Sequence, residues 1–171
     1  MKRSTFARLA LMILTFASIG YGPSVLHSAA QNAKPRPPRD RGFAAVVDSG
    51  STNTSGFRIL VEPSGRTQSI VVPRIPQGPP VELPITTVGK IPSALARRLY
   101  ADLEAAWPLS SLPPAHCLKS ASFGTRLTIE FADQATPDLS CGNITDPLVR
   151  ALARDARKIA AAPGVRQAVS R

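Results

Sequence analysis

The sequence is poor in the residues that catalytic and metal sites use most often. It holds two histidines and two cysteines among 171 residues, and His27 lies within a predicted signal peptide. His116 is then the one histidine of the exported chain, so histidine or cysteine metal sites of ordinary spacing are excluded by count. There is also no Walker-type phosphate loop and no glycine-rich dinucleotide fingerprint. We therefore expect no cofactor and no metal, and we do not expect catalysis.

A long apolar run is also missing. The run from Leu9 to Ile19 is cut short by Gly20, Gly22 and Pro23, whereas a membrane span needs roughly 20 residues. Basic residues precede this run and small residues follow it, which is typical of a cleaved signal peptide over residues 1–30. Cleavage is expected after Ala30, or alternatively after Ala33. We predict a secreted or periplasmic protein that does not span the membrane once the signal is removed.

Acidic residues are few. The chain carries 21 Lys and Arg against 11 Asp and Glu, a net charge of +10. The signal holds three of the basic residues and none of the acidic ones, so the mature chain has 18 against 11, or +7. The positive net charge favours an anionic envelope polymer as a partner. Alternatively, the charge serves only to keep the protein soluble. No specific nucleic acid is expected as a partner. A protein partner is the other candidate.

The basic residues gather on one predicted helix, which Asp146 and Pro147 begin and which continues to about residue 161. Its outer side is a candidate anion-binding face, formed by Arg150, Arg154, Arg157 and Lys158. The alternative is a solvated helix end whose positive charge suits the helix dipole.

Two cysteines in an exported chain usually pair, so we expect a Cys117–Cys141 disulfide rather than two free thiols. A bridge across this separation would stabilise the fold by roughly 3 kcal/mol. A bridged cysteine also removes Cys117 as a nucleophile beside His116. Between the cysteines, apolar and polar residues alternate over 123–131, which predicts a strand. Residues 132–135 are a polar break, and 136–141 are expected to return as a second, edge strand.

The other segments complete a single α+β domain over residues 43–162. We expect an antiparallel sheet, made of an N-terminal meander and this C-terminal hairpin, with two helices packed on one face. The order is strands, helix, hairpin, helix. The meander strands are expected at 43–50, 56–63 and 67–72, and the first helix at 92–106. A proline-rich surface loop is expected at 73–89, because proline interrupts both helices and central strands. A disordered Pro-rich basic linker is expected at 31–42 and a flexible tail at 163–171.

One motif is compatible with catalysis. Two valines followed by Asp48-Ser-Gly-Ser resemble the active-site turn of aspartic proteases, in which paired aspartates activate water. A single copy on a short chain would require a homodimer. The same residues also look like the phosphate-binding hairpin of actin-like ATPases, which need far more chain. The simplest interpretation is a hairpin turn, and an Asp48-dependent hydrolase stays an alternative.

Four blocks carry a wider resemblance: SGSTNTSGFRILV, LYADLEAAWPLSSLP, CLKSASFGT and PDLSC. Together they resemble a group of short secreted bacterial proteins of unknown function, over residues 46–160. The resemblance implies a small periplasmic or extracellular domain and brings no catalytic residues with it. We expect a disulfide-stabilised binding or structural module. A secreted protease inhibitor presenting the 73–89 loop is a further alternative.

Overall fold

The computed structural model describes residues 42–72, 85–120, 122–162 and 165. The chain divides into two units, residues 1–33 and 34–171, and every described residue belongs to the second. The predicted signal peptide lies outside the described residues. The same holds for nearly all of the predicted linker, for the proline-rich part of the 73–89 loop and for most of the predicted tail.

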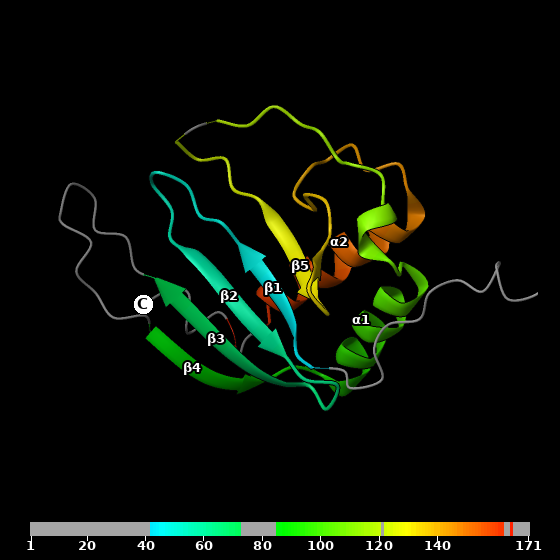
Figure 1. Ribbon diagram of the computed structural model, residues 1–171. Helices are drawn as coiled ribbons and strands as arrows, with labels where there is room; N and C mark the ends of the chain where they lie inside the picture. Colours follow the sequence, from blue (N-terminus) through cyan, green and yellow to red (C-terminus); the bar gives the residue numbers. More distant parts are fainter. Residues whose placement is uncertain (1–41, 73–84, 121, 163–164, 166–171) are drawn as a thin grey trace, which may run out of the picture. The chain divides into compact units, whose positions relative to one another are not determined.

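Six antiparallel strands form one sheet (Figure 1). Their spatial order is β4-β3-β2-β1-β5-β6, so the first strand of the domain lies between β2 and β5. Val46 in β1 stands opposite Ile59 on one side and Ile129 on the other. The meander and the C-terminal hairpin therefore share one sheet, as predicted. The strands are β1 Ala44–Asp48, β2 Gly56–Val61, β3 Arg66–Val72, β4 Ile85–Lys90, β5 Leu127–Phe131 and β6 Gln134–Ala135.

The helices begin and end close to the expected positions. Helix α1 is Ser93–Ala105, α2 is Pro147–Ala160, and a short 3-10 turn, η1, follows α1 at Leu109–Ser111. The Asp146 carboxylate accepts the first free amides of α2, each at 2.9 Å. Such a cap satisfies donors that have no partner within the helix.

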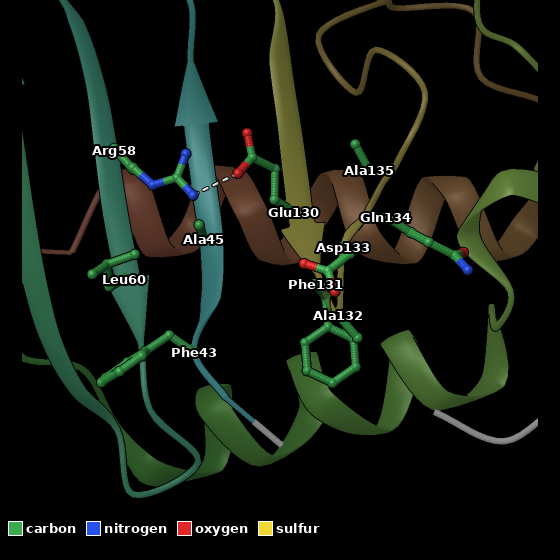
Figure 2. A pocket seen from close by; sticks show the side chains of 10 residues that line it. All are labelled: Phe43, Ala45, Arg58, Leu60, Glu130, Phe131, Ala132, Asp133, Gln134 and Ala135. Atoms are coloured by element: carbon green, nitrogen blue, oxygen red, sulfur yellow. Dashed lines mark hydrogen bonds and ion pairs between the residues drawn. The ribbon is translucent and has the colours of Figure 1, made fainter. Parts of the chain in front are cut away.

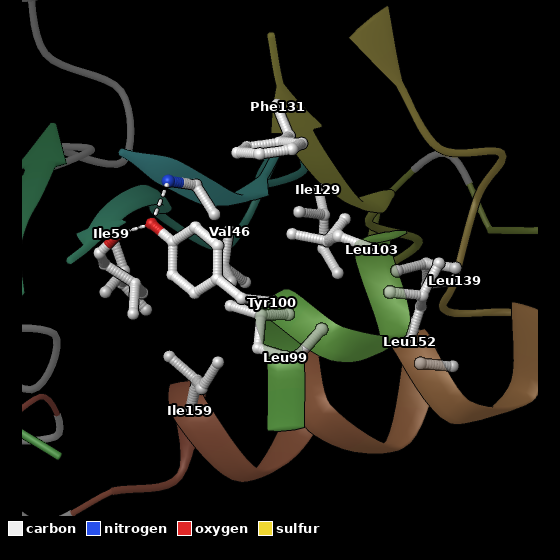
Figure 3. Packing of buried hydrophobic residues seen from close by; sticks show 14 of the residues in the cluster. Val46, Ile59, Leu99, Tyr100, Leu103, Ile129, Phe131, Leu139, Leu152 and Ile159 are labelled. Carbon is white, nitrogen blue, oxygen red and sulfur yellow. Dashed lines mark hydrogen bonds between the residues drawn. The ribbon is translucent and has the colours of Figure 1, made fainter. Parts of the chain in front are cut away.

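Both helices pack on one face of the sheet, and the core lies between them and the strands (Figure 3). Alternate residues of the central strands point into it, because side chains of a strand alternate between its two faces. Phe131 packs edge-on against Tyr100 and Trp107, with ring centroids 5.7 and 6.1 Å apart. The largest fully buried side chains include Val46, Ile59, Leu99, Leu103, Ile129, Leu139, Leu152 and Ile159.

The predicted hairpin boundaries were wrong. Strand β5 begins at residue 127 rather than 123, and Phe123 is 68% exposed. Ala132 and Asp133 both have positive φ, 47° and 59°. Two such residues make a tight two-residue turn, so the chain returns at residue 134 instead of 136. The following segment still follows β5, since the Leu139 amide donates to the Leu127 carbonyl at 2.7 Å.

The predicted surface loop at 73–89 is also corrected. Residues 85–89 belong to β4, in which Thr87 pairs with Ser69 of β3. All five prolines of the stretch precede residue 85, so nothing prevents the remainder from donating hydrogen bonds to a neighbouring strand. β4 lies at one edge of the sheet.

Candidate functional site

The predicted disulfide is present between Cys117 and Cys141, whose Cα atoms are 5.6 Å apart. The chain is therefore a disulfide-stabilised module. Cys141 is buried and Cys117 is exposed. We call the described residues from the first cysteine to the start of β5, 117–120 and 122–126, the disulfide loop. The bond connects this loop to the segment 138–141.

Lys119 forms a second connection between the same two segments. Its ammonium group donates to the Thr125 carbonyl, to the Asp138 carboxylate and to the Ser140 hydroxyl. The side chains of Lys119 and Asp138 are only 21% and 15% exposed. Their charges are thus largely removed from water and depend on each other. Thr125 lies in the loop itself, so the lysine also closes the loop internally.

Asp138 is held in its charged form. Burial alone would raise its pKa, but hydrogen bonds from Lys119 and Ser140 outweigh burial and lower the pKa below the ordinary value. The Ser140 hydroxyl donates at 2.6 Å, and the backbone amides of Ser140 and Leu127 at 3.0 and 3.3 Å. Hydrogen bonds to a carboxylate favour its ionised form. The ion pair with Lys119 therefore persists throughout the neutral range.

The disulfide loop also contacts the turn between β1 and β2. The Ser49 amide donates to the Arg126 carbonyl at 2.9 Å, and the Arg126 amide donates to the Ser49 hydroxyl at 2.9 Å. The Ser122 carbonyl accepts from the Ser51 hydroxyl at 2.8 Å and from the Asn53 amide at 3.2 Å. Figure 1 shows both segments at the same end of the sheet.

Three of the four blocks that carry the sequence resemblance thus form one spatial unit. The SGSTNTSG turn, the CLKSASFGT loop and the PDLSC segment are joined by a disulfide, an ion pair and backbone hydrogen bonds. They are far apart in the chain and meet because β1 pairs with β5.

Two large apolar side chains of this unit point into solvent. Leu118 is fully exposed and Phe123 is 68% exposed. Their backbone is tightly folded: the Gly124 amide donates to the Ser120 carbonyl at 2.7 Å. A Cβ atom at Gly124 would lie 2.4 Å from that carbonyl oxygen and 2.6 Å from the Lys119 Cβ. The loop therefore presents two apolar residues on an anchored backbone.

A broad hollow of about 1100 Å³ lies beside the loop. The loop and β5 line it, and most of its side chains are polar or charged. They include His116, Lys119, Arg126, Thr128, Thr136 and Asp138. Lys119 and Asp138 pair with each other, and Arg126 is a further charged side chain in the lining.

A second hollow, of about 490 Å³, lies on the sheet face away from the helices (Figure 2). It forms over the small side chain of Ala45, which pairs with Leu60 on one side and Glu130 on the other. Arg58 and Glu130 form an ion pair across it at 2.5 Å. These two charges satisfy each other, and Asp133 is a further charged residue among those that line the hollow.

Asp48, the candidate residue of the hydrolase alternative, is the last residue of β1 and precedes the turn to β2. One carboxylate oxygen accepts the Gly50 amide at 2.8 Å, and the other accepts the Thr125 hydroxyl at 3.1 Å. Gly50 has φ of 63°, a conformation that favours glycine. The carboxylate thus stabilises the turn and its contact with the disulfide loop. An Asp48-dependent hydrolase stays a prediction.

The predicted anion-binding face is exposed on α2, but three of its side chains have partners within the protein. Arg150 donates to the Thr145 carbonyl at 2.9 Å, and Arg157 to the Leu139 carbonyl at 2.9 Å. Arg154 pairs with Asp102 and Asp155, each at 3.4 Å. Lys158 is exposed in the last turn. Anion binding on this face stays a prediction.

Asp155 has a role that sequence reasoning missed. It is completely buried, and Arg98 of α1 donates to it at 2.8 Å. Asp155 follows Leu152 by three residues and so lies on the apolar stripe of α2. That spacing was the available signal. Nearby, burial and the charge of Asp155 raise the pKa of Asp102 above its ordinary value.

Metal and membrane features are not found in the described part of the chain. No group of three or more His, Cys, Asp or Glu residues there could hold a metal ion. No helix among these residues is both long enough and apolar enough to cross a membrane. Comparisons with protein-family models, with curated proteins and with solved structures find no match to this chain.

Proposed function

We propose that the protein is an exported binding module that recognises a protein partner through the disulfide loop. Export is supported by the signal-like N-terminal sequence and by the disulfide, since disulfides persist mainly in oxidising compartments. The resemblance to short secreted bacterial proteins points the same way.

The observation that carries the proposal is the exposure of Leu118 and Phe123 on an anchored loop. Burying a leucine or phenylalanine side chain is worth roughly 1.5–3 kcal/mol, and here that free energy is left for a partner to gain. An anchored loop also loses little conformational entropy on binding, which raises affinity. Aromatic side chains such as that of Phe123 are enriched in protein–protein interfaces relative to the rest of the surface.

Other surfaces of the domain support a binding role less well. The arginines of α2 already donate to acceptors within the protein, and the hollow over Ala45 contains a satisfied ion pair. Val88 on β4 is another exposed large apolar residue, also 68% exposed. It lies on the edge strand at the opposite end of the strand order from β5 and β6, and so serves as a matched control.

Site-specific photo-crosslinking tests the proposal. A benzophenone side chain is placed at position 118, 123 or 88 of the full chain, which is produced in cells that naturally make the protein. We expect one discrete protein adduct from positions 118 and 123 and none from position 88. Each adduct should disappear when excess unlabelled protein competes and persist when the competitor carries Leu118→Ser and Phe123→Ser.

The absence of a discrete adduct at both loop positions would contradict the proposal. Equal labelling from position 88 would do the same, because it would mean that contacts are set by exposure alone rather than by the loop.

A further inference from the structure

The chain approaches Leu118 through an irregular segment. From Pro113 to Ser120 there is no helix, strand, turn or bend. Pro113 and Pro114 stiffen its start, because the proline ring fixes φ. The backbone of this segment is therefore not paired with a strand of the sheet before it reaches Leu118.

Leu118 stands between two anchored neighbours. Cys117 is tied to Cys141 by the disulfide, and Lys119 is tied through its ammonium group to Thr125 and Asp138. Leu118 itself is fully exposed. The anchors therefore hold the backbone on both sides of one residue and leave its side chain free to enter a pocket.

We propose that Leu118 enters the specificity pocket of an endoprotease that accepts large apolar side chains, and that the loop inhibits this enzyme reversibly. The inference rests on the proposed function and names the class of partner. Endoproteases bind extended segments and insert one side chain into a deep pocket. Inhibitor loops that are ordered before binding change little in the complex, which is the condition that the disulfide and Lys119 create here.

The same anchors explain how a substrate-like segment could inhibit rather than be consumed. If the Leu118–Lys119 bond were hydrolysed, the new carboxyl end would stay attached through the Cys117 disulfide. The new amino end would stay attached through Lys119 and its acceptors. Both ends would remain in the protease cleft, so religation competes with release and the intact peptide bond is the form that persists.

This placement differs from the inhibitor alternative raised from the sequence. That alternative assigned the reactive segment to residues 73–89, of which 85–89 belong to β4 and the others lie outside the described residues. The segment around Leu118 offers what an inhibitor needs: an exposed side chain on a backbone that is anchored on both sides.

Inhibition constants measured on the oxidised full chain test the inference, with chymotrypsin and subtilisin as apolar-preferring probes and trypsin as a basic-preferring probe. We expect submicromolar inhibition of at least one apolar-preferring enzyme and none of trypsin. Leu118→Gly should weaken inhibition at least 100-fold. Leu118→Arg should transfer inhibition to trypsin, because the side chain in the pocket sets the preference. Val88→Arg is the matched control and should change nothing.

Leu118 is fully exposed, so these variants should fold, and circular dichroism checks that they do. Folded wild-type protein that inhibits neither apolar-preferring enzyme, together with a folded Leu118→Arg variant that does not inhibit trypsin, would overturn the inference. Rapid cleavage after residue 118 would overturn it as well. A discrete crosslink to a partner that is not a protease would leave the proposed function standing and remove this inference alone.

Discussion

At the scale of single residues, Lys119 and Asp138 determine whether the disulfide loop keeps its shape. The pair is mostly withdrawn from water, and each charge is satisfied by the other and by nearby hydroxyl and carbonyl groups. Removing one partner of such a pair leaves the other charge without compensation. That loss is larger than the net benefit of forming the pair.

Asp138→Asn should therefore lower the free energy of unfolding by about 3 kcal/mol at neutral pH. The pKa of Asp138 is lowered in the folded state, so its contribution is fully present above the ordinary carboxyl pKa. It is lost as the pH falls through the lower, folded-state pKa. Denaturant unfolding of both proteins across this acidic range measures the difference. If the difference in free energy of unfolding between the wild-type protein and Asp138→Asn stayed constant in strong acid, the charge of Asp138 would not be its source.

Gly124 and Gly142 offer a matched pair of substitutions beside the disulfide. A Cβ atom at Gly124 would collide with backbone and with Lys119, whereas one at Gly142 would meet nothing within 4 Å. Gly124→Ala should displace the loop and destabilise the protein by about 1–3 kcal/mol. Gly142→Ala should change stability by less than about 0.5 kcal/mol.

Thermal unfolding of the oxidised variants measures both effects, and the interface assays above show whether the displaced loop still binds. Equal stabilities for the two alanine variants would mean that the close approach at Gly124 does not constrain the loop.

At the scale of elements, the helices were predicted well because their signals are local. Asp146 and Pro147 begin α2, and Trp107-Pro108 follows the end of α1, each within a residue or two of the observed boundary. The hairpin was predicted less well. Its alternation continues past the true start of β5 to Phe123, and the turn at Ala132 and Asp133 lacks the glycine that usually marks two consecutive positive φ angles.

Arg98 of α1 and Asp155 of α2 form an ion pair between the two helices. Substituting each residue in turn distinguishes the effect of losing the partner from the effect of losing the buried charge. Arg98→Ala leaves a fully buried carboxylate without its main partner. We expect a loss of about 3 kcal/mol, at the low end for a broken buried pair because Arg98 is 41% exposed. Asp155→Asn removes the buried charge itself and keeps a hydrogen-bond acceptor. It should cost less, about 1–2 kcal/mol.

Urea unfolding at neutral pH gives both values. If Asp155→Asn were the more damaging of the two, the buried charge would not be the main reason that Arg98 is needed.

At the scale of the whole molecule, the sequence predicted the α+β class and the disulfide but not the unit around the loop. The disulfide could be predicted because the chain has two cysteines and is expected to be exported to an oxidising compartment. The contacts of Asp48 with Thr125 and of Lys119 with Asp138 join distant positions. The first exists because β1 pairs with β5, and the second because the chain after β6 returns beside β5. No strand's own pattern specifies its neighbour. The exposure of Phe123 was hidden for a different reason, because Phe123 continued the alternation of a strand.

The central claim is that the disulfide loop is rigid in the free protein, and backbone ¹⁵N relaxation tests it most directly. For the oxidised protein, the account predicts amide order parameters of about 0.8 or higher across residues 117–120 and 122–126, similar to those of β5. Values below about 0.6 across the loop would mean that its backbone is flexible. The exposed Leu118 and Phe123 would then not be held in position for a partner, and the proposed recognition role would be contradicted.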